Sequence, residues 1–368
     1  MIRGRLSYLC LETPREGQAT YTHVHEIIDG LKAGGWQVEL VATAVGGSAS
    51  GGAYWQRGLD YITAQWRLIR SLSRVDAVYV RAHFAALPAS VFAALRKRPV
   101  IQEINGLPDD IFVTYPWLGW FRTLVRASYR LQMRLANHII VVTEGLRGWA
   151  EAESGHERVS IVTNGANTRV FSPLGPRTDV EGDYVVFVGG ITAWHGLDVM
   201  VEATRNPEWP EGVRLIIIGD GKERGRLHAA ISNDEAGRVS WLGRLPQTEA
   251  AKWLRGALAA LSVTQDTQGH LGTGVAPLKL FEAMASGTAV IVTDLPFQAE
   301  LVRRERAGLV IPMADPRALA RAVAVLAADS AGAKAMGARG AAYVAEHASW
   351  QVRADQTGSI IAEVINGG

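Results

Sequence analysis

A glycine-rich loop that runs into a helical pattern is the part of this sequence whose residues most directly suggest chemistry. Residues 269–294 read GHLGTGVAPLKLFEAMASGTAVIVTD, in which Gly272, Thr273 and Gly274 precede a helix carrying Lys279 and Glu282. A helix N-terminus presents free backbone N–H groups and a partial positive charge, and both favour a bound phosphate. Lys279 and Glu282 share a helix face, which suits a lysine beside a diphosphate and a carboxylate beside ribose hydroxyls. This pattern predicts a nucleotide site. The alternative is an ordinary amphipathic helix with a solvated Lys279–Glu282 pair.

The ends of this helix are marked by residues that favour helix boundaries. Pro277 fits the first turn, where the missing N–H of proline costs nothing. Gly287 fits the position just past the C-terminus. We therefore expect the helix to span roughly the residues between them.

Two polar side chains stand near the ends of buried strand patterns in the N-terminal half. His83 follows DAVYVR (76–81), and Glu103 lies near the end of PVIQEI (99–104). Either residue is a candidate for positioning an acceptor. The competing interpretation is that each is a structural polar residue satisfied by hydrogen bonds inside the protein.

The segment FVTYPWLGWFRTLVRASYRLQMR (112–134) interleaves aromatic residues with Arg122, Arg126, Arg130 and Arg134. Arginines at every fourth position form one basic stripe on a helix. A basic amphipathic helix with aromatic residues can lie on an anionic membrane surface. It can equally be a domain helix with its aromatic residues in the core and a solvated basic face.

Short apolar runs alternate with helical patterns along the whole chain, which predicts βαβ units and parallel sheets. The segment SPLGPRTDVEGD (172–183) is rich in proline, glycine and charge, and it is the best candidate for a linker. We expect an α/β protein of two doubly wound, Rossmann-like domains, 1–171 and 184–349, facing each other across a cleft. Ligands in such sheets bind at the carboxyl ends of the strands, where the strand order reverses. The predicted strands are residues 5–11, 37–43, 76–81, 99–104, 138–143, 161–165, 184–190, 213–221, 239–243, 258–263 and 288–294.

Composition excludes several classes of function. The lone cysteine, Cys10, rules out a disulfide framework and a zinc–cysteine cluster, and a net charge of +2 gives no indication of a nucleic-acid partner. Patterns of the HEXXH, CxxC and GxSxG types are absent, which argues against zinc hydrolases, thiol redox enzymes and serine hydrolases. Neither a signal peptide nor an apolar run long enough to span a bilayer is found, so a cytoplasmic location is expected.

With these motifs in order along the chain, the sequence resembles the retaining GT-B glycosyltransferases of family 4. The signature region looks like PLKLFEAMASGTAVIVTD, followed by Glu300 and GLVIPMADPRALA (308–320). Further pieces are VVFVGGITAWHGLDVMVEA (185–203), LIIIGDG (215–221), VSWLGRLP (239–246) and TNGANTRVFSP (163–173). The likeness covers nearly the whole chain, and the ordered set is far more specific than any single piece.

The resemblance implies a role for individual residues. Glu282 occupies the second of the family's paired glutamates and would hold the ribose, while Leu278 and Lys279 would contact the diphosphate. Asn164 and Gly165 match the turn at the interdomain crossing, and the C-terminal helix, about 350–368, would pack back on the N-terminal domain. The implied donor-binding residues are Gly17, Gly189, Gly190, His195, Gly219, Gly221, Gly243, Arg244, Leu245, Gly272, Thr273, Gly274, Leu278, Lys279 and Glu282.

The chain departs from the family pattern at four positions. Gly274 replaces the first glutamate, Gly190 replaces an arginine, His195 stands for a lysine, and Asn105 stands where many relatives carry a histidine near the sugar. Losing two fixed cations weakens the stabilisation of a leaving diphosphate. His195 could donate to phosphate, more strongly when protonated; otherwise it is a surface residue beside a cleft-wall tryptophan, Trp194.

The implied activity is transfer of a hexose-type sugar from a nucleoside-diphosphate sugar to a hydroxyl acceptor, with retention and without a metal or cofactor. The acceptor domain is the N-terminal one, and polysaccharide, lipid-linked and natural-product acceptors all stay open, as does peripheral membrane contact through 112–134. The candidate catalytic residues are Asn105, Glu103, His83 and His195. The rival functions are an inactive glycosyltransferase-like binding partner, which Gly190 and Gly274 favour, and a nucleotide-sugar epimerase.

Overall fold

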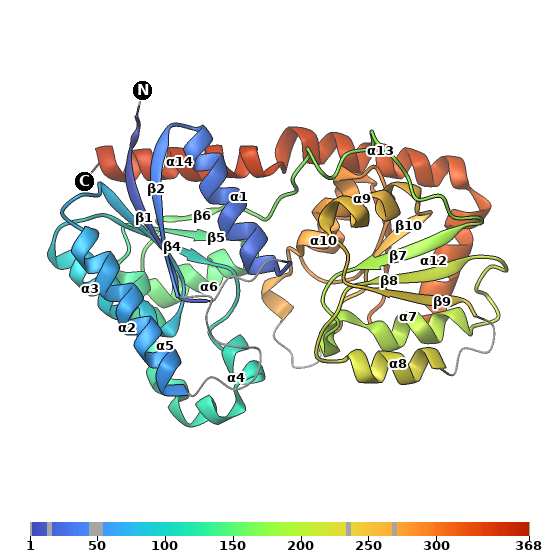
Figure 1. Cartoon of the computed structure of the whole chain (residues 1–368), viewed down its shortest axis with the longest axis horizontal. Coiled ribbons are helices and arrows are strands. Elements are labelled where there is room, and N and C mark those ends of the chain that lie inside the picture. The colour runs from blue at the N-terminus through green and yellow to red at the C-terminus, as the bar shows by residue number, and fades with distance from the viewer. Residues whose placement is uncertain (1, 13–16, 44–53, 233–236, 267–270, 368) are drawn as a thin grey trace. The chain divides into compact units, whose positions relative to one another are not determined.

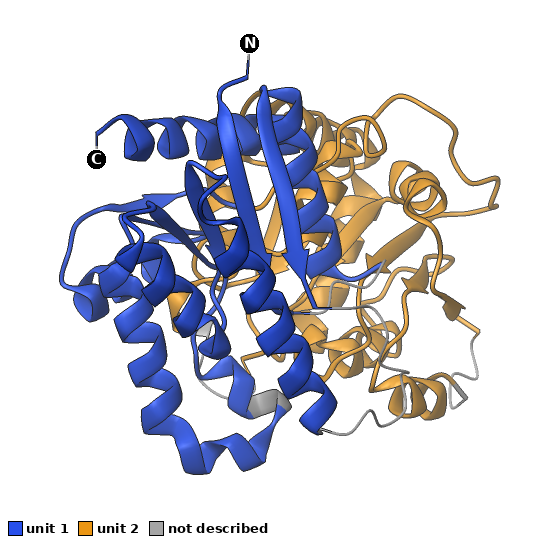
Figure 2. Cartoon of the chain, turned by 60° about the vertical axis from the view of Figure 1, so that its left-hand side comes forward, with its two compact units in different colours: residues 1–163, 350–368 blue, residues 164–349 orange. Residues whose placement is uncertain are grey.

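The computed structural model describes residues 2–12, 17–43, 54–232, 237–266 and 271–367. These residues form two compact units, coloured separately in Figure 2. Unit 1 comprises Met1–Thr163 and Trp350–Gly368, and unit 2 comprises Asn164–Ser349. The proline- and glycine-rich segment 172–183 therefore belongs to unit 2 in this division.

Unit 1 is a doubly wound α/β domain built on a six-stranded parallel sheet, in the order β2-β1-β3-β4-β5-β6 (Figure 1). The order reverses between β1 and β3, as in other doubly wound sheets. The strands are β1 (Gly4–Cys10), β2 (Trp36–Ala42), β3 (Ala77–Arg81), β4 (Val100–Ile104), β5 (His138–Val141) and β6 (Val159–Ile161). The helices are α1 (Ala19–Ala33), α2 (Tyr54–Ser71), α3 (Leu87–Leu95), α4 (Asp110–Thr114), α5 (Arg122–Leu135), α6 (Glu144–Ser154) and α14 (Trp350–Asn366), with short 3-10 turns at η1 (Phe84–Ala86) and η2 (Pro116–Phe121).

The C-terminal helix α14 packs against α1 inside unit 1. Gly30 of α1 lies so close to α14 that an added Cβ would stand 2.3 Å from the Cβ of Ala354. His23 of α1 also meets the Trp350 ring edge-on, with centroids 5.2 Å apart. The last 19 residues are therefore part of the N-terminal domain's packing.

Unit 2 is a second doubly wound domain, whose six-stranded parallel sheet has the order β12-β11-β10-β7-β8-β9. Read from the other edge, this is the 3-2-1-4-5-6 order of dinucleotide-binding folds, with its switch point between β7 and β10. The strands are β7 (Tyr184–Val188), β8 (Arg214–Ile218), β9 (Val239–Gly243), β10 (Ala259–Ser262), β11 (Val290–Thr293) and β12 (Gly308–Ile311). The helices are α7 (Leu197–Thr204), α8 (Arg224–Ser232), α9 (Gln247–Gly256), α10 (Leu278–Ala285), α11 (Gln298–Glu305), α12 (Pro316–Ala328) and α13 (Ser330–His347), with 3-10 turns at η3 (Ala193–His195) and η4 (Leu271–Thr273).

The fold class predicted from the alternating pattern is confirmed in both units. Strands buried on both faces read as continuous apolar runs, as in RLIII of β8, whose last four residues are buried. The strand β12, with the sequence GLVI, is not among the strands predicted from the sequence. Pro277 differs from expectation: it is the N-cap of α10, outside the first turn, with ψ 137°. Gly287 does follow the helix, with φ +74°, as predicted.

Candidate functional site

The strand order of unit 2 reverses between β7 and β10, and several of the predicted donor residues lie at that reversal. Gly189 and Gly190 follow the last residue of β7 directly, and η3 carries His195. The backbone N–H of Gln265, which follows β10, donates to the Trp194 carbonyl at 2.8 Å, so the β7 loop and the β10 loop are joined. Lys279 reaches the same place from the first turn of α10. The structure therefore brings together residues far apart in the sequence.

The ammonium group of Lys279 is buried at this edge without a hydrogen-bond partner among the described residues. Its Nζ lies 4.3 Å from the centroid of the Phe187 ring and 3.2 Å from where a Cβ on Gly189 would stand. Burial lowers the pKa of Lys279 from 10.5 to about 7, and the nearby Glu282 carboxylate opposes that shift. An aromatic face recovers only part of the hydration that a buried cation loses. Lys279 is thus a cation placed to gain from an incoming anion.

His195 is held with one ring nitrogen engaged by the β7 loop. Its Nδ1 lies 2.6 Å from the Gly190 carbonyl oxygen and 2.9 Å from Thr192 Oγ1. A carbonyl can only accept, so Nδ1 carries the proton and Nε2 of the neutral ring is an acceptor. Burial and, to a smaller extent, the Lys279 charge lower the pKa of His195 to about 3, although the bond to Gly190 opposes both. The neutral ring does not donate to phosphate through Nε2, so the predicted donation requires proton uptake.

Close backbone packing accounts for two of the predicted glycines. A Cβ on Gly219 would stand 1.8 Å from the Gly189 carbonyl oxygen, and one on Gly221 would stand 2.3 Å from that of Ile191. These contacts press the loop after β8 onto the loop after β7, so no larger residue fits either position without backbone movement. Gly190 differs, because a Cβ there would meet only ordinary contacts, 3.7 Å from Thr192 Cγ2 and 3.9 Å from His195 Cε1. The absence of an arginine at Gly190 is therefore not imposed by space.

The loop before α10 explains why a glutamate is unsuited to position 274. Gly274 has φ +89°, and an added Cβ would stand 3.2 Å from the Pro296 carbonyl oxygen. A side chain there would be both crowded and in the left-handed region. Glu282 lies partly buried on α10. The remaining predicted donor residues are Gly243 at the end of β9 with φ +70°, exposed Arg244 and Gly272, and partly buried Leu245, Thr273 and Leu278.

Unit 1 carries a buried carboxylate at the carboxyl end of its own sheet. Glu103 of β4 lies opposite Arg81 of β3 in register, and Arg81 Nη1 donates to Glu103 Oε1 at 2.6 Å. The hydroxyl of Tyr79 donates to Oε2 at 2.7 Å and that of Tyr8 at 3.2 Å. His23 Nε2 lies 2.8 Å from Oε1. The carboxylate therefore has protein partners at both oxygens.

These partners hold Glu103 in its charged form. Burial alone would raise its pKa, but His23, Arg81 and the Tyr79 hydrogen bond together bring the pKa well below its usual range. Burial also works against the charge of Arg81, and Glu12 and Glu103 more than offset it, so the pKa of Arg81 is raised. The network favours a structural role for Glu103 over direct contact with an acceptor.

The other predicted residues of unit 1 lie around this network. Asn105 donates its side-chain amide to Glu103 Oε1. His83 Nδ1 accepts from the Ala85 N–H at 3.2 Å and caps η1, and burial lowers the pKa of His83 to about 4. Gly17 lies just before α1 with φ +79°. The approach of Gly17 to a donor phosphate stays a prediction.

Five residues of this network carried no sequence prediction: Tyr8, Glu12, His23, Tyr79 and Arg81. The available signal was a charged residue near the end of each of two strands that are otherwise apolar, AVYVR and VIQEI. A pair of opposite charges in neighbouring buried strands indicates an internal ion pair. The tyrosines and His23 become visible only once the register and the packing of α1 are known.

The arginines of segment 112–134 do lie on one helix, as predicted, and all four are exposed on α5. The aromatic residues divide between core and surface: Phe112 is buried, whereas Trp120 is 92 % exposed. Arg126 pairs with Asp109 and Arg130 with Glu153. The buried Phe112 fits a domain helix with a solvated basic face, and contact of the exposed aromatic residues with a membrane stays a prediction.

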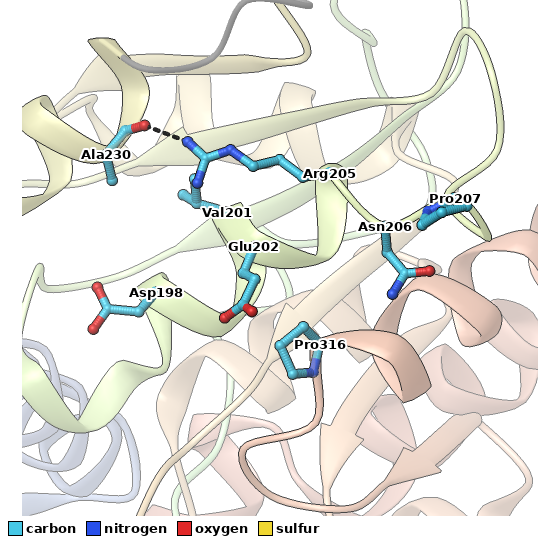
Figure 3. Close-up of a pocket in the computed structure, with 8 residues that line it drawn as sticks. All are labelled: Asp198, Val201, Glu202, Arg205, Asn206, Pro207, Ala230 and Pro316. Atoms are coloured by element: carbon cyan, nitrogen blue, oxygen red, sulfur yellow. Dashed lines mark hydrogen bonds between the residues drawn. The ribbon is translucent and has the colours of Figure 1, made fainter.

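A depression of about 590 Å³ is bordered by α7, α8 and α12 and is lined by other residues (Figure 3). Arg205 reaches across it and donates to the Ala230 carbonyl oxygen at 2.8 Å. Asp198 at its edge is paired with Arg226. None of the predicted site residues lines it, so it carries no role in the candidate site; its lining consists of Asp198, Val201, Glu202, Arg205, Asn206, Pro207, Ala230 and Pro316.

Two kinds of feature are absent from the described ranges. No group of three or more histidine, cysteine, aspartate or glutamate side chains in those ranges is arranged to hold a metal ion. None of the helices in them combines the length and apolar character needed to cross a bilayer.

Comparison with known protein families matches both units. A family model described as Glycosyltransferase Family 4 matches residues 21–170, and one described as Glycosyl transferases group 1 matches residues 182–329. The alpha-maltose-1-phosphate synthase of Mycolicibacterium smegmatis is 26 % identical over 83 % of this chain and 84 % of its own length. Matches to two other curated relatives span only 20 % and 46 % of those proteins.

Solved structures share the fold at low sequence identity. Sucrose-phosphate synthase from Thermosynechococcus elongatus superposes with a TM-score of 0.80 at 16 % identity, over 99 % of this chain and 100 % of the other. The HepE protein of Anabaena, in complex with UDP-glucose, superposes with a TM-score of 0.73 at 13 % identity, over 98 % and 100 %. The two-domain GT-B architecture follows from these likenesses and the two six-stranded sheets.

Proposed function

Because the chain belongs to the group 1 glycosyltransferases, enzymes of the transferase class, we propose that it moves a hexose-type sugar from a nucleoside-diphosphate sugar to a hydroxyl acceptor. The observation that carries this proposal is the buried Lys279 ammonium at the switch point of unit 2, which has no hydrogen-bond partner among the described residues. A cation held this way is costly in the free protein and becomes favourable when a diphosphate arrives.

The proposed donor site is built around α10. The diphosphate would lie against the Lys279 ammonium and the N-terminal amides of α10, where charge develops on the leaving group as the glycosidic bond breaks. Lys279 then supplies from the helix the charge that family members carry at the positions of Gly190 and His195. Glu282, one turn further along, would accept hydrogen bonds from the ribose hydroxyls. The complex of HepE with UDP-glucose supports a donor of this class.

Retention of configuration and independence from metal ions are part of the same proposal. A leaving diphosphate that is stabilised by Lys279 and by backbone amides needs no bound cation to offset its charge. The acceptor hydroxyl would attack from the face that the diphosphate leaves, without a protein nucleophile. His195 and His83 are neutral near pH 7 and Glu103 is fully paired, so each would position groups around the reaction.

For the acceptor, we propose a hydroxyl group that unit 1 binds, on a polysaccharide, a lipid-linked sugar or a natural product. The exposed arginines of α5 beside exposed Trp117 and Trp120 favour a membrane-proximal acceptor. Peripheral contact through residues 112–134 is therefore included in the proposal.

Thermal unfolding in the presence of UDP, GDP, dTDP and ADP, each with and without EDTA, tests the donor site. A ligand that binds only the folded state adds RT ln(1 + [L]/Kd), about 2.7 kcal/mol at one hundred times Kd. We expect one nucleotide to stabilise the protein, EDTA to leave that shift unchanged, and Glu282→Ala to reduce it.

The same experiment separates the proposed enzyme from a binding partner without activity. Stabilisation by a nucleotide followed by no sugar transfer from any matching donor would favour the binding partner. A complete lack of stabilisation would contradict the donor site itself. A shift that EDTA removes would overturn the proposal of metal independence.

A further inference from the structure

Helix α2 displays a stripe of large apolar side chains to solvent. Trp55, Leu59, Ile62 and Trp66 are each at least 53 % exposed. Their spacing of four, three and four residues puts them on one face of the helix. We call these four residues the α2 stripe. Isolated exposed apolar residues are common, but a continuous row of this size is not.

The stripe is separate from the packing of α2 in unit 1. Ala64, Gln65 and Leu68 are the buried residues of the same helix, and Gln65 Oε1 accepts a hydrogen bond from the Ala89 N–H at 3.1 Å. These residues anchor α2 to the sheet and to α3. The stripe faces away from them and contributes nothing to the core.

Further exposed apolar residues lie on the neighbouring elements. Figure 1 shows α2, α3 and α5 close together at the lower left, and α3 contacts both of the others. The N-terminal end of α2 meets η2, since Arg57 Nη1 donates to the Tyr115 hydroxyl at 3.0 Å. Trp120 and Leu124 follow at that end and are among the most exposed apolar residues of the protein. Trp120 and Leu124 are therefore a second exposed apolar group of unit 1, separate from the α2 stripe.

Arginines flank the stripe at the other end of α2. Arg67, Arg70 and Arg74 line a groove together with Arg5, and Glu39 also borders it. The Arg70 guanidinium lies 5.7 Å from the centroid of the Trp66 ring, so charge and apolar surface are contiguous. Within the described residues, neither Arg67 nor Arg70 nor Arg74 forms an ion pair with a carboxylate.

We infer that α2 docks on the surface of an anionic lipid bilayer, with the α2 stripe among the headgroups and upper acyl chains and the flanking arginines on lipid phosphates. Tryptophan is suited to the boundary between headgroups and chains, and arginine to bidentate binding of phosphate. A second copy of the chain fits less well, because an isologous contact would cover the apolar side chains but would supply no phosphate to the flanking arginines. Charge complementarity therefore selects the lipid surface.

This inference does not rest on sugar transfer, and it deepens the proposed membrane contact of residues 112–134 by adding a second, larger element. The failure of either proposal can be recognised separately, since nucleotide stabilisation reports the donor site and vesicle binding reports α2.

Co-sedimentation of the full chain with vesicles tests the inference. We expect binding to phosphatidylcholine vesicles containing phosphatidylglycerol, and much weaker binding to phosphatidylcholine alone. Trp55→Gln/Trp66→Gln should weaken binding by on the order of tenfold for each tryptophan. Arg67→Gln/Arg70→Gln/Arg74→Gln should weaken it by about fivefold for each arginine and reduce its dependence on salt.

Matched controls make the result decisive. Met313→Gln/Val325→Gln replaces two exposed apolar residues of unit 2 and should leave vesicle binding unchanged. The α2 variants should keep the melting temperature and nucleotide stabilisation of the parent protein, because the substituted side chains lie outside the core. Equal vesicle binding by the parent and by Trp55→Gln/Trp66→Gln would overturn the inference. The inference would also be overturned if the parent protein forms a dimer in solution, if Trp55→Gln/Trp66→Gln abolishes that dimer, and if neither protein binds vesicles.

Discussion

Glu103 in unit 1 and Lys279 in unit 2 each carry a charged group that is buried near the carboxyl end of a parallel sheet, but the surroundings of the two groups are opposite. Glu103 has partners at both oxygens, including Arg81 and Tyr79. Lys279 has an aromatic face and no hydrogen-bond partner among the described residues. A paired charge is an internal part of the fold, whereas an unpaired one is stabilised when a ligand supplies its partner. Burial alone therefore does not identify the site.

Removing the charge of Glu103, which is paired inside the protein, should have the largest effect. Glu103→Gln keeps the shape of the side chain but leaves the buried Arg81 without its nearest charge partner. We expect a loss of about 3–5 kcal/mol in the free energy of unfolding, the usual cost of removing one member of a buried pair. Urea denaturation measures this, with the exposed Glu157→Gln as the control. A variant as stable as the parent would mean that Arg81 and His23 find other partners.

Removing the unpaired charge of Lys279 should leave the stability of the protein intact and weaken nucleotide binding. Lys279→Met keeps an unbranched side chain as far as the Cε position but removes the ammonium group, and so relieves the cost of a buried cation. We expect nucleoside-diphosphate affinity to fall about 10- to 100-fold, from the roughly 1.5–3 kcal/mol of a charged hydrogen bond. Calorimetric titration checks the affinity, and urea denaturation should show that the protein is no less stable.

Lys252→Met is the matched control for this variant. Lys252 is a surface lysine of unit 2 that pairs with Glu249 at 2.8 Å, so its removal should change neither property appreciably. If Lys279→Met keeps its affinity for nucleoside diphosphates, the diphosphate binds elsewhere. Lys279 would then not differ from Glu103 in being available to a ligand.

The sequence predicts the Lys279 site much better than it predicts the Glu103 network. Lys279 is predictable because it follows a glycine loop at the start of a helix, and both features are local. The Glu103 network depends on the register of β3 against β4 and on α1 packing His23 over the sheet, which are non-local. Gly274 shows the same limit, since its φ of +89° and its closeness to Pro296 become known only from the fold. Likewise, the α2 stripe can be recognised as solvent-exposed only once the opposite face of the helix is known to be buried.

The pH dependence of nucleotide binding sharpens the comparison further. The pKa of Lys279 is about 7 in the free protein, and a bound diphosphate raises it, so binding above pH 7 requires uptake of a proton. Between pH 7.5 and 9.5 we expect affinity to fall by up to about tenfold per pH unit, a range in which the diphosphate is already fully ionised. His195 adds nothing here, because its pKa of about 3 leaves it neutral throughout. Lys279→Met should show a flat profile.

The stability of the free protein should move in the opposite direction over this range. An unfolded lysine keeps its proton to about pH 10.4, whereas folded Lys279 has largely lost it above pH 7. The unfolded state then binds more protons, so the contribution of Lys279 makes the free energy of unfolding rise with pH. Comparing urea denaturation of the parent and Lys279→Met across the range isolates that contribution. Equal slopes for the two proteins would contradict a lysine of lowered pKa.

The smallest effect should come from removing the charge of Glu12, the second carboxylate beside Arg81. Glu12 Oε2 lies 3.5 Å from Arg81 Nε, but the Glu12 side chain is 41 % exposed, whereas that of Glu103 is 2 % exposed. Solvent screens the Glu12 interaction, so Glu12→Gln should cost less than about 1 kcal/mol in urea denaturation. Raising the salt concentration should shrink this difference further and leave the effect of Glu103→Gln almost unchanged. If the two substitutions cost the same, exposure would not be what separates them, and the distinction between an internal charge and an available one would have to rest on geometry alone.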